Sequence, residues 1–280
     1  MNELVLLTGS TGFVGRHVLN ALLSRKIFVR LIMRGKAENM PNSEYIESII
    51  YSDDIFSESS NWWTSVSSGV TLVIHLAWYT EPGKYLNAIE NLDCLSGTLR
   101  LAQGAVASGV RKFVGIGTCF EYKLGGLPLS IETELQPLSI YASTKAAAYQ
   151  TLLAFFKRSE IVFLWCRLFY IFGDGEDGRR LVPYVKRRLE AGEFVELSSG
   201  THVRDYMNVR DAAESIVFLA LGEHQGAVNI CSGRPITIRK FVETIADQYG
   251  ARHLLRFGAR VDLDSEPGFV VGVPADESRC

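Results

Sequence analysis

The chain has 280 residues, 47% of them hydrophobic and 21% charged, and its 29 basic and 31 acidic residues give a formal net charge of −2. This balance suits a folded α/β protein and provides no basic field that would attract a nucleic acid or an anionic membrane surface. No apolar run reaches transmembrane length, no basic leader precedes the first predicted strand, and the five cysteines lack the paired spacing of zinc sites. We therefore expect a cytoplasmic protein with reduced thiols and without a metal site, a membrane anchor or a nucleic-acid partner.

The predicted elements begin with a strand, a glycine-rich turn and a helix. An apolar run over residues 4–7 leads into Thr8-Gly9-Ser10-Thr11-Gly12-Phe13-Val14-Gly15, and residues 16–23 have helical character. Glycines let a backbone approach its ligand closely, and the N–H groups at a helix N-terminus favour negative charge. An ordinary tight turn is the alternative, but the strand–turn–helix context favours a cradle for the pyrophosphate of a dinucleotide.

The next strand, predicted over residues 28–33, bears on the kind of dinucleotide. Where an NAD-binding unit carries an Asp or Glu for the ribose 2′-hydroxyl, this chain has Met33, followed by Arg34. A guanidinium forms charge-assisted hydrogen bonds with phosphate, so the missing acid and the adjacent Arg34 indicate the 2′-phosphate of NADP(H). The alternative for Arg34 is a solvated surface side chain.

Two further strands are predicted over residues 45–51 and 70–76. Asp54 follows the first of them and could accept a hydrogen bond from an adenine amino group, although a helix N-cap is an equally good interpretation. The second is an apolar run typical of a buried parallel strand, and its exit at residues 76–77 should lie against the cofactor. We expect His75 to be a packed side chain rather than an acid–base catalyst, because no carboxylate lies near it in the sequence.

The rest of the chain alternates predicted helices and strands, and the pattern changes beyond Phe172. In chain order these elements are a helix over 84–108, a strand over 112–117, a long loop over 122–137, a helix over 139–157 with Ser139 as its N-cap, a strand over 161–167, a helix over 181–191, a strand over 194–197, a helix over 212–221, a strand over 228–230 and a helix over 241–249. This order predicts an α/β fold: a Rossmann-type doubly wound parallel sheet over 1–172 and a smaller C-terminal α/β part over 173–280, with some segments interleaved.

Tyr141 and Lys145 are four residues apart on the helix predicted over 139–157, so they share one face. A phenol has a reference pKa near ~10, and a nearby ammonium group would lower it toward the range that acid–base catalysis needs. Such a pair alone is more often an exposed helix pair. Thr118, at the end of the preceding strand, adds a hydroxyl that could serve the same substrate oxygen, so the set predicts a hydride-transfer site.

Together these motifs resemble the extended short-chain dehydrogenase/reductases that act on nucleotide sugars. The resemblance rests on residues 9–15, Thr118, Tyr141 with Lys145, and residues 204–211, and it spans nearly the whole chain. It implies that Thr118, Tyr141 and Lys145 are the catalytic residues. The residues assigned to the cofactor are Gly9, Ser10, Thr11, Gly12, Phe13, Val14, Arg34, Asp54, Ile55, Leu76, Ala77, Tyr141, Lys145 and Leu168.

The resemblance also implies a site for the nucleotide sugar in the smaller C-terminal part. The residues assigned to this substrate are Thr118, Cys119, Tyr170, Leu181, Val182, Phe194, Leu197 and Arg204. Arg204 would bind the diphosphate, whereas the four between Leu181 and Leu197 lie where the family contacts the base, although each alone suits a core position. Two positions depart from the family: Cys94 stands for the Asn of its Asn-x-x-Gly-Thr motif, and Tyr170 for an Asn that often touches the sugar nucleotide.

The residues after Thr118 narrow the reaction that the resemblance implies. The 4,6-dehydratases place Asp-Glu there, and the fucose-synthase type places a Cys two residues after the hydroxyl, whereas this chain has Cys119 and Phe120. Residues 118–122 and 165–170 are most similar to reductases of nucleotide-linked 4-keto-6-deoxyhexoses. The expected activity is NADPH-dependent reduction of the C4 ketone of a dTDP-, CDP- or GDP-linked sugar, by a homodimer.

Two alternatives to this reductase stay open. One is a nucleotide-sugar 4-epimerase with tightly bound NAD(P), and the other is a non-catalytic NADP-binding regulator. The intact set of Thr118, Tyr141 and Lys145 argues against the regulator, because a protein that only binds the dinucleotide has no need of the phenol.

Overall fold

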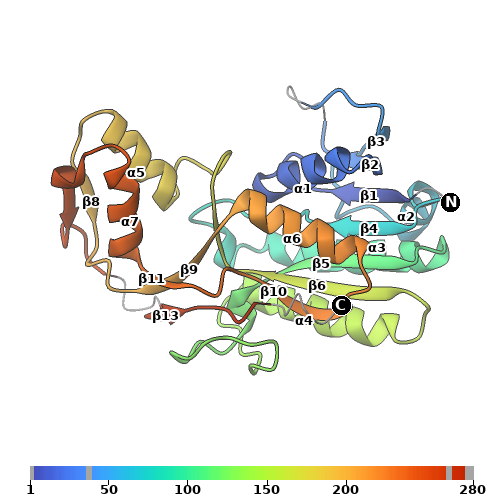
Figure 1. Cartoon of the computed structure of the whole chain (residues 1–280). Helices are drawn as coiled ribbons and strands as arrows, with labels where there is room; N and C mark the ends of the chain where they lie inside the picture. Colours follow the sequence, from blue (N-terminus) through green and yellow to red (C-terminus); the bar gives the residue numbers. More distant parts are fainter. Residues whose placement is uncertain (1–2, 36–39, 263–266, 275–280) are drawn as a thin grey trace.

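The computed structural model describes residues 3–35, 40–262 and 267–274. Its central feature is a seven-stranded sheet with the strand order β10-β6-β5-β4-β1-β2-β3, in which every neighbouring pair is parallel (Figure 1). This arrangement confirms the predicted Rossmann-type fold. The strands are β1 (Leu4–Thr8), β2 (Phe28–Met33), β3 (Ile46–Tyr51), β4 (Leu72–His75), β5 (Lys112–Thr118), β6 (Val162–Leu168) and β10 (Gly226–Ile230).

Helices cover both faces of this sheet (Figure 1). They are α1 (Phe13–Ser24) and α6 (Val209–Leu221) on one face, and α2 (Ser60–Val66), α3 (Glu90–Ala107) and α4 (Ile140–Phe156) on the other. Successive side chains of a strand point to opposite faces, so a strand covered on both sides is apolar throughout. In β1, Val5 and Leu7 pack with α1 and α6, whereas Leu6 packs with Trp63 of α2 and Leu101 of α3.

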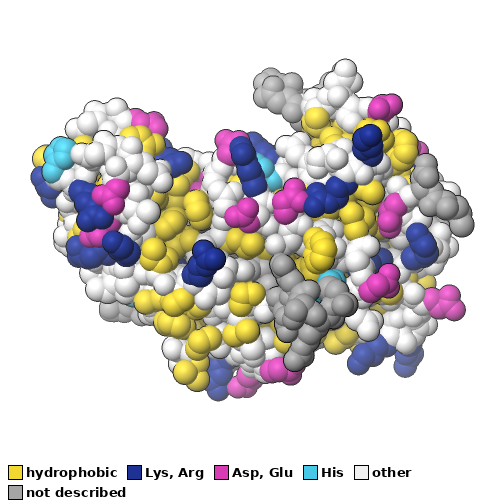
Figure 2. Space-filling view, in the orientation of Figure 1, with side chains coloured by type: hydrophobic (Ala, Val, Ile, Leu, Met, Phe, Trp, Pro, Cys, Tyr) yellow, Lys and Arg dark blue, Asp and Glu magenta, His cyan; other side chains and the backbone are white. Residues whose placement is uncertain are grey.

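A smaller part lies beside the carboxyl ends of the large sheet, at the left of Figure 1. Its helices are α5 (Leu181–Glu190) and α7 (Ile238–Asp247), and its strands are β7 (Tyr170–Phe172), β8 (Val195–Leu197), β9 (Val203–Asn208), β11 (Pro235–Thr237), β12 (Leu255–Phe257) and β13 (Phe269–Val270). Strand β9 pairs with β11, β13 and β7, and β8 pairs with β12. After β9 the chain returns through α6 and β10 to the large sheet. Figure 2 shows a hollow between the two parts, with hydrophobic side chains on its walls.

Some predicted elements differ from those observed. The helix predicted over 84–108 is divided into a short 3-10 turn, η1 (Tyr85–Asn87), and α3, which begins at Glu90. The side chain of Asn91 causes the division, because it donates hydrogen bonds to the carbonyls of Tyr85 and Ala88 and so holds a separate turn in front of the helix. The predicted cap of α4 is confirmed: Ser139 Oγ accepts a hydrogen bond from the Ala142 N–H at 3.2 Å. Within the described part of the chain, no helix has the length and apolar character needed to span a membrane.

Candidate active site

The glycine-rich turn between β1 and α1 is packed too tightly for other residues. Gly9 has φ +74°, and a Cβ there would lie 2.7 Å from the Ala77 amide nitrogen, while a Cβ on Gly15 would lie 1.9 Å from the Gly9 carbonyl oxygen. Gly12 is the N-cap of α1, so no side chain caps this helix, and its first turn carries no acidic residue. The first N–H groups of α1 therefore keep their capacity to bind an anion.

A buried hydroxyl in the same turn supports a ligand there. Ser10 is only 2% exposed, and among the described residues its Oγ has no hydrogen-bond partner. Leaving a buried polar group unsatisfied costs about 1–3 kcal/mol, so such a group usually marks a bound water, ion or ligand. The uncapped helix, the glycine turn and the Ser10 hydroxyl together fit the pyrophosphate of a dinucleotide.

The other residues predicted to hold the cofactor lie along the carboxyl edge of the sheet. Arg34 is exposed immediately after β2, and Met33 before it is buried. Of the two interpretations of Asp54, the helix N-cap is not found: its Oδ1 accepts the Phe56 N–H at 3.0 Å in a turn, and Ser59 is the N-cap of α2. Of the remaining residues, Ile55 is buried, Leu76 and Ala77 are half-buried after β4, and Leu168 is half-buried at the end of β6.

His75 is a packed side chain, as the sequence predicts. Its Nδ1 shares a 2.8 Å hydrogen bond with Thr8 Oγ1, and its Nε2 shares one of 2.9 Å with Thr98 Oγ1. Burial lowers the pKa of His75 to about 3, so the ring is neutral near neutral pH. The Thr8 hydroxyl also accepts the Ala77 N–H at 3.2 Å, so His75 helps to fix the strand ends beneath the glycine turn.

The structure brings the three predicted catalytic side chains together. Thr118 ends β5, Tyr141 lies in the first turn of α4, and the Thr118 side chain is close enough to the Tyr141 phenol to influence its pKa. Lys145 follows one turn later and is buried, with its Nζ 6.0 Å from the Tyr141 ring centroid. Its Nζ donates a 2.6 Å hydrogen bond to the Ile116 carbonyl and lies 3.6 Å from the centroid of the Trp78 ring.

The pKa values of Tyr141 and Lys145 differ from those that their four-residue spacing leads one to expect. Burial raises the pKa of Tyr141, and the neighbouring Thr118 side chain only partly opposes this effect. Burial also lowers the pKa of Lys145 to about 7, and the negative charge of Glu121 opposes that shift. The expected lowering of the Tyr141 pKa by Lys145 is therefore not found. The reason is that the phenol is buried, and Lys145 contacts a carbonyl and an indole ring instead of the phenol oxygen.

Glu121 is a member of the site that the sequence reasoning missed. It is fully buried in the 3-10 turn η2 (Cys119–Glu121), and its Oε1 accepts the Thr118 N–H at 2.8 Å. Thr118 Oγ1 accepts in turn the Phe120 N–H, and this reciprocal pair is a capping box. The signal was present in the sequence, because Thr118-x-x-Glu121 has the spacing of that motif. Glu121 therefore fixes the backbone from which the Thr118 hydroxyl projects.

A buried hydrogen-bond network supports Glu121 from behind. Arg167 donates from Nε to Glu121 Oε2 at 2.7 Å, and Trp165 Nε1 lies 3.1 and 3.2 Å from the two carboxylate oxygens. The Arg167 guanidinium lies between the Tyr122 and Tyr149 rings, 4.7 and 4.6 Å from their centroids, and donates to the Tyr122 hydroxyl. The network thus joins β5, β6 and α4 directly beneath the Thr118 hydroxyl.

Three residues predicted to contact the nucleotide sugar, Cys119, Tyr170 and Arg204, lie near one another in the fold. Cys119 is buried, and burial raises the pKa of its thiol to about 12, so the group remains a neutral thiol. The ring of Phe120 meets that of Tyr170 edge-on at 6.2 Å between centroids, and the Arg204 guanidinium lies 5.2 Å from the Tyr170 ring. Arg204 is 2% exposed and donates to the carbonyls of Val203 and Pro267 at 3.0 and 2.7 Å.

The four residues predicted near the base differ in exposure. Val182 and Leu197 are buried in the core between α5 and α7, and Leu181 is partly buried against them. Phe194 is 51% exposed, and the Arg256 guanidinium lies 4.0 Å from its ring centroid. Val182 and Leu197 would therefore reach a base only through their backbone groups.

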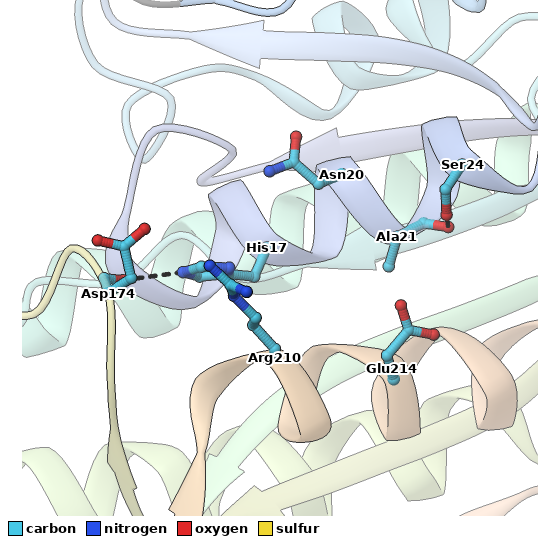
Figure 3. Close-up of a pocket in the computed structure, with 7 residues that line it drawn as sticks. All are labelled: His17, Asn20, Ala21, Ser24, Asp174, Arg210 and Glu214. Atoms are coloured by element: carbon cyan, nitrogen blue, oxygen red, sulfur yellow. Dashed lines mark hydrogen bonds between the residues drawn. The ribbon is translucent and has the colours of Figure 1, made fainter.

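A separate cavity of about 330 Å³ lies between α1 and α6, away from this set (Figure 3). The residues that line it are His17, Asn20, Ala21, Ser24, Asp174, Arg210 and Glu214. A 2.9 Å hydrogen bond between His17 Nε2 and the Asp174 carbonyl closes one end of it. None of these residues belongs to the predicted site, so the cavity is not part of the candidate active site.

Comparison with known proteins identifies the family. The chain belongs to the NAD dependent epimerase/dehydratase family, whose sequence profile matches residues 5–231. It is 24% identical over 268 residues to the dTDP-6-deoxy-L-talose 4-dehydrogenase (NAD(+)) of Aggregatibacter actinomycetemcomitans, covering 92% of this chain and 94% of that protein. It is 23% identical over 282 residues to the CDP-abequose synthase of Salmonella typhimurium, with 97% and 90% coverage.

Solved structures share the fold. One of them is the UDP-N-acetylglucosamine 4-epimerase from Methanobrevibacter ruminantium M1 in complex with UDP-N-acetylmuramic acid. The TM-score is 0.83 at 23% sequence identity, and the alignment covers 99% of this chain and 90% of the epimerase. The fold and the family together place this chain among the extended short-chain dehydrogenase/reductases.

Proposed function

We propose that this protein catalyses the NADPH-dependent reduction of the C4 ketone of a nucleoside-diphosphate 4-keto-6-deoxyhexose. One observation carries the proposal: Thr118 ends β5 and Tyr141 lies in the first turn of α4, so the fold brings a hydroxyl and a phenol close together at the carboxyl edge of the sheet that also carries the glycine turn. A hydroxyl and a phenol placed this way can both meet a single substrate oxygen. This arrangement suits a ketone that receives a hydride and then a proton.

The dinucleotide, when bound, would supply the hydride, and the chain supplies the proton and the positioning. Thr118 donates a hydrogen bond to the ketone oxygen, and Tyr141 transfers its phenolic proton to the alkoxide that develops there. The raised pKa of Tyr141 keeps the phenol protonated near neutral pH, which is the form that a reduction requires.

The residues around the reacting carbon limit the chemistry to hydride transfer. A dehydration needs an additional acid and base, and the residues that follow Thr118 are the neutral Cys119 thiol and the hydrocarbon ring of Phe120. The glutamate that comes next, Glu121, is fully engaged by Thr118, Trp165 and Arg167. The rings of Phe120 and Tyr170 meet edge-on beside Thr118, and we expect this apolar surface to accept the C6 methyl group of a 6-deoxy sugar.

The cofactor preference is a further part of the proposal. The glycine turn and the Ser10 hydroxyl would hold the pyrophosphate, and Arg34 would hold the 2′-phosphate of NADP(H). The relative from Aggregatibacter is named for NAD(+), so the preference for NADPH depends on Met33 and Arg34 of this chain alone. Arg204 would bind the sugar diphosphate.

We also propose that the protein acts as a homodimer. Helices α3 and α4 pack against each other, and exposed apolar side chains lie on or next to them, among them Ile89 (71% exposed), Leu92 (50%) and Ile140 (38%). Apolar groups left exposed on neighbouring helices favour contact with a second protein surface. Light scattering on the purified protein tests this, and a monomer at micromolar concentration would contradict it.

The test of the activity is a panel of dTDP-, CDP-, GDP- and UDP-linked 4-keto-6-deoxyhexoses, each incubated with the purified protein and NADPH. We expect loss of NADPH absorbance and formation of one 4-hydroxy product with one member of the panel. Interconversion of 4-hydroxy epimers by a protein that copurifies with dinucleotide would identify an epimerase. Tight NADPH binding without any turnover would identify a regulator.

A further inference from the structure

A tryptophan lies on the catalytic lysine. The Nζ of Lys145 is 3.6 Å from the centroid of the Trp78 ring, which is closer than its distances to the Tyr141 and Trp165 rings. A cation over an indole face at this distance is attracted by the ring, and the attraction grows when water is excluded. Trp78 follows β4 and is only half-buried, so its orientation needs a further contact.

That contact comes from Asn91. Trp78 donates from Nε1 to Asn91 Oδ1 at 2.8 Å, and Asn91 is fully buried in the first turn of α3. The Nδ2 of the same carboxamide donates to the Tyr85 carbonyl at 2.7 Å and to the Ala88 carbonyl at 2.9 Å. One side-chain amide therefore holds both the tryptophan and the 3-10 turn η1.

The 3-10 turn leads back to the other catalytic residue. The ring of Tyr85 meets that of Tyr141 edge-on, with 4.9 Å between centroids and 87° between planes. The contacts thus run from Lys145 through Trp78 and Asn91 to Tyr85 and end on Tyr141. An amide provides an acceptor and two donors in one plane, and no hydrocarbon side chain of the same size can replace these three bonds.

We propose that Asn91 is a positioning residue for the proposed hydride transfer, acting on Lys145 through Trp78 and on Tyr141 through Tyr85. This inference rests on the proposed function for its kinetic consequences. Asn91 lies one helical turn before Cys94, and Cys94 accepts the Tyr79 N–H at 3.3 Å, so α3 holds the loop after β4 at two successive turns.

Several ionisable groups surround Lys145 besides those on its own helix. Glu121 of η2 and Cys94 of α3 favour its charged form, and His75 of β4, which is neutral, is influenced by the lysine charge in turn. On α4 itself the nearby ionisable group is Tyr141. None of these groups is changed by substitution of Asn91 or Trp78. A change in the titration of Lys145 in those variants therefore reports on the position of the lysine.

The kinetic test uses Asn91→Leu, Trp78→Phe, the double variant, and Gln103→Leu as a control on the exposed face of the same helix. We expect Asn91→Leu to lower kcat by about 10- to 100-fold, because small displacements of catalytic groups are costly, while the KM for the sugar nucleotide and the Kd for NADPH change by less than about 3-fold. In the Trp78→Phe background, Asn91→Leu should lower kcat by a smaller factor than it does in the otherwise unmodified protein. The control should match the unmodified protein.

A second readout needs neither substrate nor cofactor. Loss of the proton from Lys145 near a pKa of about 7 should change the tryptophan fluorescence of the ligand-free protein, and both Trp78→Phe and Lys145→Met should abolish that change. We expect Asn91→Leu to shift its midpoint or to remove it. The proposal would be overturned if Asn91→Leu left the pH midpoint of the fluorescence change where it is in the unmodified protein. It would also be overturned if this variant lost kcat, NADPH affinity and thermal stability to the same extent. Absence of any reductase activity in the unmodified protein would reject the proposed function alone, because the fluorescence titration still tests Asn91.

Discussion

Glu121 and Arg167 form an ion pair that is closed to solvent: Nε and Oε2 are 2.7 Å apart, and the side chains are 0% and 1% exposed. The second oxygen of Glu121 accepts the Thr118 N–H, so the pair lies directly behind the residue that carries the proposed catalytic hydroxyl. Removing one partner of a buried pair leaves an uncompensated charge and costs about 3–5 kcal/mol. The pair therefore couples the stability of the fold to the geometry of the site.

Glu121→Gln should lower the free energy of unfolding by several kcal/mol and also lower kcat, because Arg167 loses its counter-charge and Thr118 loses its anionic acceptor. Urea unfolding and steady-state kinetics measure the two effects. Glu134→Gln is the matched control, since Glu134 forms an exposed pair with Lys123 that is worth less than about 1 kcal/mol. If Glu121→Gln and Glu134→Gln changed the free energy of unfolding and kcat to a similar extent, the buried pair would contribute no more to stability or catalysis than an exposed one.

The pH dependence of stability should include a contribution from His75. Its pKa is 6.5 when unperturbed and about 3 in the fold, so between these values the unfolded chain binds a proton that the native protein does not. The free energy of unfolding should therefore fall as the pH drops from 6.5 toward 3. In His75→Gln this part of the decline should disappear. If the free energies of unfolding of the unmodified protein and of His75→Gln fell in parallel between pH 6.5 and 3, His75 would not be the packed, neutral side chain described above.

Arg34→Ala tests the cofactor. The unmodified protein should bind NADPH at least about tenfold more tightly than NADH, since one charge-assisted hydrogen bond is worth about 1.5–3 kcal/mol. The variant should lose most of this preference while its affinity for NADH stays the same. Isothermal titration with both dinucleotides gives the four constants. If the unmodified protein bound NADPH and NADH equally tightly, Met33 and Arg34 would not select the 2′-phosphate.

Arg204→Ala should raise the KM for the sugar nucleotide strongly and leave the Kd for NADPH nearly unchanged. The structure adds a second expectation, because Arg204 is buried and donates to two backbone carbonyls around β9. The variant should therefore also be less stable. Arg204→Lys keeps the charge and part of the packing. It should therefore restore most of the lost stability, while the KM for the sugar nucleotide stays raised. Equal losses of affinity for both ligands would indicate a purely structural residue.

The sequence predicted well those features that depend on local pattern. The apolar runs of β1, β2, β5 and β6 are buried on both faces, and such runs identify parallel strands without any knowledge of their neighbours. The glycine spacing predicted the turn at Gly9 for the same reason, since only glycine fits there. The short elements β7, β11 and β13 were not predicted, because two or three residues carry no periodicity and form strands only by pairing along β9.

The sequence predicted that Thr118, Tyr141 and Lys145 come together, but it predicted neither Glu121 nor the electrostatics of the set. Thr118, Tyr141 and Lys145 follow from position and spacing, whereas the charge on Glu121 is balanced by Arg167, 46 residues later in the chain. The burial of these side chains could not be predicted from the sequence either. A four-residue spacing suggests that Lys145 acts on Tyr141, but in the fold its ammonium group contacts the Trp78 ring and the Ile116 carbonyl. Such relationships depend on which strands lie side by side.

The proposed reaction reduces a ketone and oxidises NADPH. The decisive experiment measures NADPH oxidised against 4-hydroxy sugar nucleotide formed, for the unmodified protein and for Tyr141→Phe. We expect one NADPH consumed per product formed, and in the variant a kcat lower by about 10²-fold or more with NADPH affinity retained, because the proton donor is lost and the ring is kept. Exchange of 4-hydroxy epimers without consumption of NADPH, or full activity of Tyr141→Phe, would contradict it.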